Sequence, residues 1–243
     1  MSGHSKWSKI KRGKAITDAK RGKVFSKYVK MISVAAREKG GDPKTNPTLR
    51  MVIEKARSEN MPYENIERAI KKGTGEIEGA RMENFTYEAY APGGIALIIE
   101  GITDNKNRTL SEIKHMISTL GGKFAESGSV SYLFQKKGVV TINNEKKEIS
   151  KEDLELAAIE AGAEDIKWMD ENILEIYTKP EELDSIKKSL EENGAAIDSS
   201  SLDWVAASEI EVSDEKTKAQ VEKLMDALDE HDDVNEIYSN LIT

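Results

Sequence analysis

The 243-residue chain contains no cysteine, which excludes disulfide bonds, thiolate nucleophiles and the cysteine ligands of zinc and iron–sulfur sites. No apolar run approaches the roughly 18 to 20 residues that a membrane-spanning helix needs, and no secretory signal pattern is present. The three histidines, His4, His115 and His231, share no metal-ligand spacing. We therefore expect a cytoplasmic protein with no metal, no cofactor and no membrane partner.

Sequence patterns typical of catalysis are also missing. The chain has no G-x-S-x-G, P-loop or dinucleotide-binding glycine pattern. The segment "TDNKNRT" at 103–109 is polar enough to bind phosphate at a helix N-terminus, but no base or nucleophile accompanies it. We interpret Asp104 and Asn105 as turn and helix-cap residues. The sequence predicts that the protein is not an enzyme.

Charge is divided unevenly along the chain, whose formal net charge is -8. Residues 1–72 hold 19 lysines and arginines against 7 acidic residues, which gives +12. The rest of the chain holds 17 against 37, which gives -20. Such a division predicts that the first part attracts polyanions while the remainder repels them.

The basic residues are densest at the start of the chain, where glycines and apolar residues separate them. Because Gly3, Gly13 and Gly22 let the backbone approach a phosphate chain closely, we favour a nucleic-acid contact over a solvated tail. Trp7 either stacks on a base or packs on its own domain. The predicted nucleic-acid-binding residues are Lys6, Trp7, Lys9, Lys11, Arg12, Lys14, Lys20, Arg21, Lys23, Lys27 and Lys30.

Hydrophobic periodicity predicts an α+β protein of three domains: an N-terminal basic helical domain followed by two ferredoxin-like α/β domains. Helical spacing follows Val24, restarts at Asn46 with Pro47, and appears again after Pro62, so we assign residues 1–78 to the helical domain. Residues 137–203 read as a complete β-α-β-β-α-β series. This series interrupts a discontinuous α/β domain made of residues 79–136 and 204–243.

Several details of these α/β domains follow from local patterns. We expect strands at "FTYEAYAP", "GIALIIEGIT" and "SVSYLF", and a helix whose capping box pairs Thr109 with Glu112. In the inserted domain we expect a helix opened by Ser150 and a second from Pro180 to Asn193. The tail supplies a strand at "WVAASEIEV", a helix, and a strand at "VNEIYSN", and we expect it to return to residues 82–134.

Six ordered segments carry a resemblance to a known family: "GHSKWSKIK", "DAKRGKVFSK", "GGDPKTNPTLR", "NMPYENIERAIKKGTG", "TDNKNRT" and "SGSVSYLF". The chain resembles the YebC family of bacterial regulatory proteins, to which the mitochondrial translational activator of cytochrome oxidase subunit I is also similar. Two departures are Met31, where an acidic residue is common, and "WVAASEIEV", which lacks the usual proline.

The resemblance implies a three-domain protein with a helical N-terminal domain, named in bacteria as a probable DNA-binding transcriptional regulator. Relatives have also been tied to ribosomes and to translation of proline-rich sequences. Two hypotheses therefore stay open: a regulator that binds duplex DNA, and a translation factor held on ribosomal RNA and facing tRNA or protein. Under either hypothesis the partner is a nucleic acid, with the ribosome as a further partner, and we expect a monomer.

Overall fold

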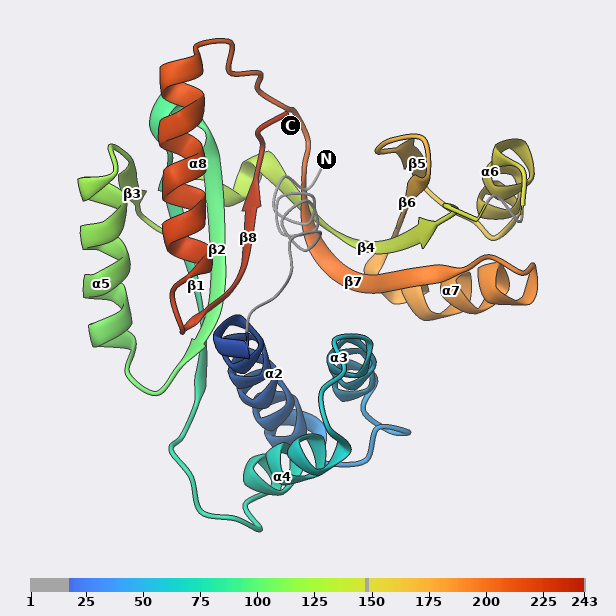
Figure 1. Cartoon of the computed structure of the whole chain (residues 1–243), viewed down its shortest axis with the longest axis horizontal. Coiled ribbons are helices and arrows are strands. Elements are labelled where there is room, and N and C mark those ends of the chain that lie inside the picture. The colour runs from blue at the N-terminus through green and yellow to red at the C-terminus, as the bar shows by residue number, and fades with distance from the viewer. Residues whose placement is uncertain (1–17, 147–148, 243) are drawn as a thin grey trace. The chain divides into compact units, whose positions relative to one another are not determined.

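The computed structural model describes residues 18–146 and 149–242. Within these residues no helix is long and apolar enough to cross a membrane. The described chain forms two compact units: one is Phe134–Val205, and the other joins the residues before it to those from Ala206 onward. Figure 1 shows the elements of both units.

Three helices form the N-terminal region: α2 (Asp18–Lys39), α3 (Pro47–Ser58) and α4 (Tyr63–Thr74). Their apolar side chains meet in one core, where Ile32, Leu49 and Ile66 are almost fully buried. The predicted helices are confirmed, because the apolar residues at three- and four-residue spacing are the ones that face this core.

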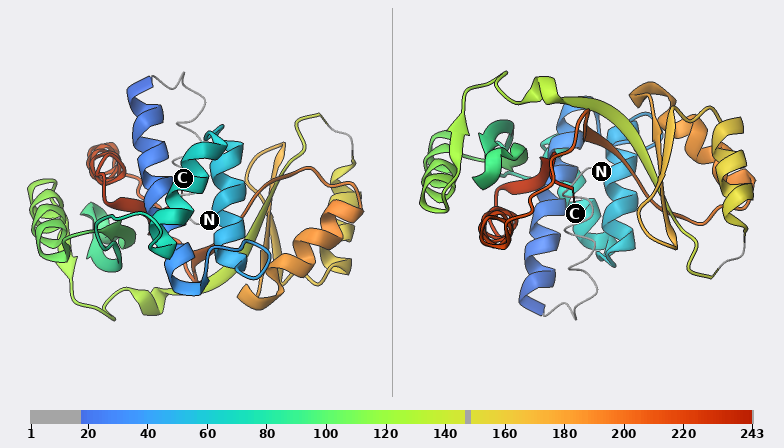
Figure 2. Two further views of the ribbon diagram at one scale, coloured as in Figure 1. Left: turned by 90° about the horizontal axis from the view of Figure 1, so that it is seen from below. Right: turned by 90° about the horizontal axis from the view of Figure 1, so that it is seen from above.

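Asn46 fastens the start of α3 to the end of α2. Its side-chain oxygen accepts the backbone N–H of Leu49 at 3.0 Å, which satisfies one of the unpaired donors of a helix N-terminus. Its amide nitrogen donates to the carbonyl oxygens of Ala35 and Gly40, each at 2.8 Å. Since Asn46 is fully buried, this cap also fixes how the two helices meet. Figure 2 shows the ribbons of these helices in two further views.

The first sheet has the strand order β3-β1-β2-β8. Strand β2 pairs antiparallel with β1 and with β8, and β1 pairs antiparallel with β3. Helices α5 and α8 pack against the sheet and share its core with β1, β2 and β8 (Figure 1). The elements are β1 (Glu83–Tyr90), η1 (Pro92–Gly94), β2 (Ala96–Thr103), α5 (Lys106–Thr119), β3 (Lys123–Ala125), η2 (Ser131–Leu133), α8 (Glu215–Asp229) and β8 (Val234–Ser239).

The predicted return of the tail to residues 82–134 agrees with the pairing of β8 on β2. Two local predictions are wrong. "SVSYLF" does not form a strand of this sheet: Ser131–Leu133 is a 3-10 turn, and Phe134 begins a strand of the second sheet. Thr109 does not cap α5, because the helix begins three residues earlier and Asn105 is its N-cap. Both errors arise because turn and cap residues follow one another closely in these segments.

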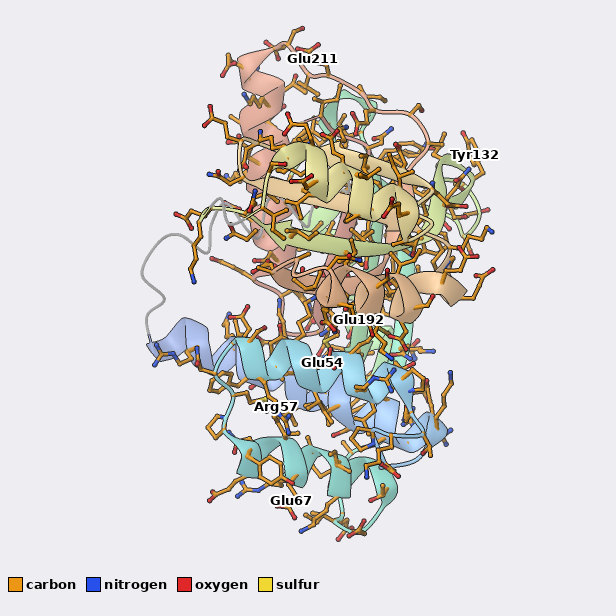
Figure 3. All side chains as sticks on the ribbon, turned by 90° about the vertical axis from the view of Figure 1, so that its right-hand side faces the viewer. Glu54, Arg57, Glu67, Tyr132, Glu192 and Glu211 are labelled. Carbon is orange, nitrogen blue, oxygen red and sulfur yellow. The ribbon has the colours of Figure 1, made fainter. Side chains whose placement is uncertain are left out.

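A buried carboxylate holds the loop that replaces the predicted strand. Glu88 of β1 accepts the backbone N–H groups of Gly128 at 2.8 Å, of Val130, and of Ser131 at 3.1 Å. Burial acts to raise the pKa of Glu88, but the three donors outweigh it and hold the pKa below its ordinary value. The loop is thereby fixed in place, and the side chain of Tyr132 projects from it, 73% exposed (Figure 3).

The unit Phe134–Val205 contains the second sheet, of strand order β5-β6-β4-β7, and the element order is the predicted ferredoxin-like series. Strand β6 pairs antiparallel with β4 and with β5. Its elements are β4 (Phe134–Asn143), α6 (Lys151–Glu160), β5 (Asp165–Trp168), β6 (Ile173–Thr178), η3 (Pro180–Glu182), α7 (Leu183–Glu192) and β7 (Ile197–Ala206). Ser150 caps α6 as predicted, since its hydroxyl accepts the N–H of Asp153.

The residues "WVA" belong to the end of β7, so the first tail strand predicted from "WVAASEIEV" is wrong. The predicted fold class is confirmed: a helical N-terminal region precedes two four-stranded antiparallel sheets, each with two helices. The two sheet domains differ in the order of their elements along the chain: the first follows β-β-α-β-α-β and the second β-α-β-β-α-β. The assigned domain boundaries stay predictions.

Candidate nucleic-acid interface

The structure describes only part of the predicted nucleic-acid-binding set. Lys6, Trp7, Lys9, Lys11, Arg12 and Lys14 lie outside the described residues, and so does the side chain of Lys20. The remaining four residues, Arg21, Lys23, Lys27 and Lys30, all belong to α2. The described residues therefore show what this part of the basic face of α2 contacts.

Lys23, Lys27 and Lys30 form what we call the lysine row. They are spaced four and three residues apart, so their side chains lie on one face of α2. Each of them contacts the end of α8 and the turn that follows it. We call this stretch, Asp229–Asp233, the acidic segment; its sequence is "DEHDD".

The three lysines bind both backbone and side-chain oxygens of the acidic segment. The ammonium of Lys23 donates to the carbonyl of Glu230 at 3.2 Å and lies 3.7 Å from Asp232 Oδ1. Lys27 donates to the carbonyl of Asp229 at 2.7 Å. Lys30 donates to Asp233 Oδ1 at 2.6 Å and to the carbonyl of Asp232 at 3.0 Å.

The lysine row supplies a charge that α8 lacks. The carboxyl end of a helix carries a partial negative charge and is stabilised by cations. Helix α8 has no basic residue in its last turn and ends instead in Asp226 and Asp229. The acidic end of α8 is therefore unfavourable by itself and is compensated by α2, some 200 residues away in the sequence.

Lys27 is the most enclosed member of the row, since its side chain is 18% exposed. Burial lowers the pKa of this lysine below its ordinary value, although the carboxylates of Asp229, Glu236 and Asp232 act in the opposite direction. A second contact lies nearby, where Lys55 of α3 binds Glu236 of β8 at 2.7 Å. The helical region thus contacts the first sheet domain through lysine–carboxylate pairs.

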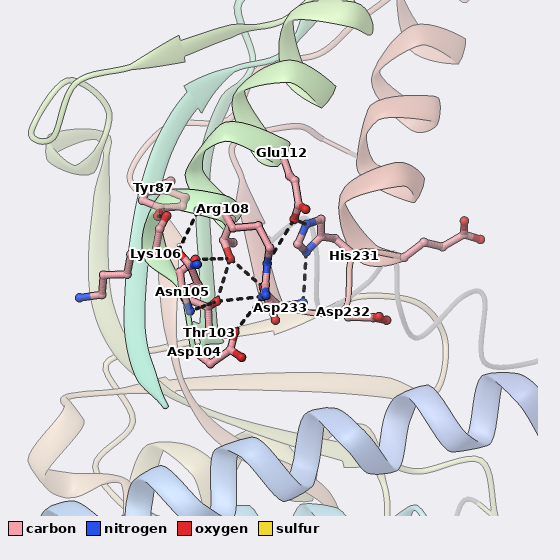
Figure 4. Close-up of polar contacts among 12 residues, drawn as sticks. Tyr87, Thr103, Asp104, Asn105, Lys106, Arg108, Glu112, His231, Asp232 and Asp233 are labelled. Carbon is pink, nitrogen blue, oxygen red and sulfur yellow. Dashed lines mark hydrogen bonds and ion pairs between the residues drawn. The ribbon is translucent and has the colours of Figure 1, made fainter. Parts of the chain in front are cut away.

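Asp233 is the centre of a buried polar network (Figure 4). Its carboxylate is 6% exposed and accepts hydrogen bonds from Lys30 at 2.6 Å, from Arg108 Nη2 at 2.9 Å and from the hydroxyl of Thr109 at 2.7 Å. Burial acts to raise the pKa of Asp233, but the bonds from Lys30, Thr109 and Arg108 outweigh it, and the pKa lies far below its ordinary value. The carboxylate is therefore charged throughout the neutral range.

Both ring nitrogens of His231 take part in this network. Its Nδ1 accepts the backbone N–H of Asp233 at 3.1 Å, so that nitrogen carries no hydrogen. Its Nε2 lies 3.1 Å from Glu112 Oε2 and donates to that carboxylate. With both ring nitrogens bonded within the protein, the imidazole ties the acidic segment to α5.

In the "TDNKNRT" segment, the predicted helix-cap role of Asn105 is confirmed. Asn105 caps α5 by accepting the N–H of Arg108 at 3.1 Å. The side chain of Arg108 reaches back to Asp104 and across to Asp233, each at 2.9 Å. Thr109 is fully buried in the first turn of α5 and donates to Asp233.

A cavity of about 760 Å³ opens beside this network, lined by both charges. Its walls include the cations Lys23, Lys30 and Arg108 and carboxylates that already bind them. Among residues 18–146 and 149–242, no group of three His, Asp or Glu side chains could hold a metal ion.

The acidic segment is the feature of this region that sequence reasoning missed. A signal for it exists, because a predicted helix that ends in acidic residues and carries no lysine or arginine in its last turn needs a cation from elsewhere. The sequence does not say which of the chain's 36 lysines and arginines supplies it. Only the structure identifies the lysine row.

Comparisons with known proteins cover almost the whole chain. The family model described as the TACO1/YebC protein N-terminal domain matches residues 5–76, and the model described as the TACO1/YebC second and third domain matches residues 82–241. A protein of Halothermothrix orenii named "Probable transcriptional regulatory protein" is 51% identical over 240 residues, which is 99% of this chain and 94% of that protein. A protein of the same name from Persephonella marina is 49% identical, covering 99% and 95%.

The fold is similar to a solved structure as well. The crystal structure of a conserved hypothetical protein from Aquifex aeolicus superimposes with a TM-score of 0.85 at 48% sequence identity. The match covers 93% of this chain and 91% of the other.

Proposed function

The chain belongs to the TACO1/YebC family, and from this premise we propose that it is a non-enzymatic regulator of gene expression that binds nucleic acid through its basic N-terminal region. The observation that carries the proposal is the division of charge. The first 72 residues carry +12 and the remainder carries -20, so the N-terminal region alone attracts a polyanion. The names of the relatives agree with a role in transcription.

The short turn between two N-terminal helices supports the transcriptional form of the proposal. Helices α3 and α4 each have 12 residues, and the four residues Glu59–Pro62 join them. Asn60 has φ of 61°, the left-handed conformation that lets the chain reverse in so short a turn. A helix-turn-helix uses a turn of this length to place its second helix in the major groove.

A second candidate function is that of a translation factor bound to ribosomal RNA, the ribosome or tRNA, acting on proline-rich stretches. The observation in its favour is the mixture of lysine, glycine and aromatic residues in the segment "GHSKWSKIKRGK", since irregular RNA is recognised by phosphate contacts and stacking. Both candidates place the protein in the cytoplasm as a monomer, without a cofactor or membrane partner.

The test of nucleic-acid binding replaces Lys9, Lys11, Arg12 and Lys14 with glutamate. Binding to DNA and RNA probes is measured by fluorescence anisotropy over a salt series. The variant should bind more weakly, and its dependence of log affinity on log salt should flatten by about 0.9 per lost phosphate contact on duplex DNA or about 0.7 on a single strand. Unfolding by urea should shift by less than about 0.5 kcal/mol.

The matched control replaces four exposed lysines of the acidic part of the chain with glutamate: Lys179, Lys216, Lys218 and Lys223. This control changes the total charge equally and should retain most of the affinity. If the two variants bind alike, the N-terminal residues are not the binding element. A preference for one duplex sequence indicates the transcriptional regulator, whereas a preference for structured RNA and co-sedimentation with ribosomes indicates the translation factor.

A further inference from the structure

The lysine row and the acidic segment neutralise one another in the described structure. Three consecutive cations of α2 contact backbone carbonyls of the acidic segment. Each also faces one of its carboxylates: Lys23 lies 3.7 Å from Asp232, Lys27 lies 3.9 Å from Asp229, and Lys30 lies 2.6 Å from Asp233. The chain therefore covers part of its own most basic helix with an anionic surface.

The spacing of the row suits a nucleic-acid backbone. At a rise of about 1.5 Å per residue, Lys23 and Lys30 lie roughly 10.5 Å apart along α2. One strand of a duplex carries a phosphate every 3.4 Å or so of its axis, so the row can face about three phosphates. The carbonyl and carboxylate oxygens of the acidic segment occupy the positions that these phosphates would take.

We propose that the acidic segment is an internal competitor for the lysine row, and that a nucleic-acid backbone must displace it in order to contact α2. This inference rests on the proposed function, which it deepens by naming the contact that regulates access to the site. The acidic segment thereby weakens non-specific binding, because only a ligand that outcompetes it gains these three cations.

The contact is built so that it can open. The side chains of Lys23 and Asp232 are 56% and 76% exposed, and ion pairs of this kind are worth little. Asp233 is different, because its carboxylate is buried. It keeps Arg108 and Thr109 as partners when Lys30 leaves, so opening does not strand a buried charge.

The experiment compares the parent with a variant carrying Asp229→Asn and Asp232→Asn, which leaves Asp233 intact. A matched control carries Glu126→Gln and Glu211→Gln, two exposed residues outside the acidic segment that remove the same total charge (Figure 3 labels Glu211). Affinity for a duplex DNA and for a structured RNA is measured over a salt series. Thermal melting and far-ultraviolet circular dichroism establish that each variant is folded.

The Asn variant should bind both probes roughly three- to tenfold more tightly than the control, because two partly exposed pairs no longer have to be broken. Its salt dependence should also be steeper. In the parent, the displaced carboxylates take up cations from solution and cancel part of the counterion release that accompanies binding.

A second variant tests the same contact without relying on tighter binding. Because the chain has no cysteine, Lys23→Cys with Asp232→Cys introduces the only two thiols, and a short bismaleimide can join them. The joined protein should bind nucleic acid at least threefold more weakly than the same protein capped with N-ethylmaleimide. Equal binding by the joined and capped forms would overturn the inference.

The outcomes separate the two proposals. If the parent binds nucleic acid while the Asn variant matches its control in both affinity and salt slope, the internal competitor is refuted and the proposed function stands. If the parent, the Asn variant and the capped protein all fail to bind, the proposed function fails and the inference fails with it. If only the Asn variant binds, both are supported.

Discussion

Replacing Asp233 with asparagine is the sharpest test of the polar network. The carboxylate is 6% exposed and accepts hydrogen bonds from three donors on two helices: Lys30 of α2, and Arg108 and Thr109 of α5. Asparagine keeps the shape of the side chain but removes its charge. Its amide nitrogen also presents a donor where the partners themselves donate, so at least one bond is lost.

The size of the effect follows from the burial of each partner. Removing one member of a buried ion pair costs about 3 to 5 kcal/mol, because the other charge is left uncompensated. The side chains of Lys30 and Arg108 are 19% and 45% exposed, so water recovers part of this loss. We therefore expect the free energy of unfolding of the first sheet domain to fall by about 2 to 3 kcal/mol at pH 7.

The pH dependence gives an independent check. The folded pKa of Asp233 lies below the value of about 3.9 that an unfolded aspartate has, so the unfolded chain binds more protons as the solution is acidified. The stabilisation by Asp233 is thus complete above about pH 4 and is lost as the pH falls through the folded pKa. The difference in stability between parent and variant should shrink over the same range.

The assay is hydrogen exchange measured by mass spectrometry at increasing urea, on peptides that cover β2, α5 and β8. In a Trp7→Phe background, tryptophan fluorescence serves as an internal reference, because the two remaining tryptophans, Trp168 and Trp204, belong to the unit Phe134–Val205 and should not respond. The matched control is Asp232→Asn, which removes an equal charge from a 76% exposed side chain and should cost less than about 0.5 kcal/mol. If Asp233→Asn costs no more than this control, the network does not stabilise the domain.

Three further predictions concern the first sheet domain. Glu88→Gln should lower the free energy of opening of the loop at Gly128 by about 1 to 3 kcal/mol, which is measured as faster hydrogen exchange and proteolysis there. Unchanged protection of the loop would contradict a stabilising role for the hydrogen bonds to Glu88. Gly101→Ala should destabilise the domain by about 3 kcal/mol in urea unfolding. The added Cβ would lie 2.0 Å from the Asp233 carbonyl oxygen and 2.4 Å from the Phe85 ring. A cost below about 1 kcal/mol would mean that the β-bulge beside Gly101 relaxes easily. Deleting residues 209–243 should abolish the protection of β2 amides from hydrogen exchange, because it exposes the edge of β2 and the apolar face of the sheet that α8 covers. If the shortened protein still unfolds in one cooperative transition, the tail is an independent appendage.

Several features of the protein follow from local sequence because their physical causes are local. The helical core is an example, since Tyr28, Ile32 and Leu49 recur at the spacing that places them on inner helix faces. The ferredoxin-like series is another, because alternating strands and single amphipathic helices leave few ways to bury their apolar faces. The helix caps at Ser150 and Asn105 depend on residues within three positions of each other.

Local patterns fail where two signals compete within a few residues. Thr109 has the side chain of an N-cap and Glu112 the spacing of a capping box, but Asn105 takes the cap and Thr109 is drawn into the core by Asp233. Ser131–Leu133 likewise has strand-forming residues. The three backbone bonds to Glu88, which is 40 to 43 residues away, hold this loop in another conformation.

The sequence by itself determined that one part of the protein is basic and the rest acidic, because net charge depends only on composition. It also determined which residues are cations with helical spacing. The tertiary structure alone decided what those cations contact. Lys30 and Asp233 are 203 positions apart in the sequence, and they meet because β8 pairs with β2 and brings the end of α8 to α2. No local pattern specifies this arrangement of α8 and α2. Electrostatic pairing depends on distance and burial, which are set once the cores have packed.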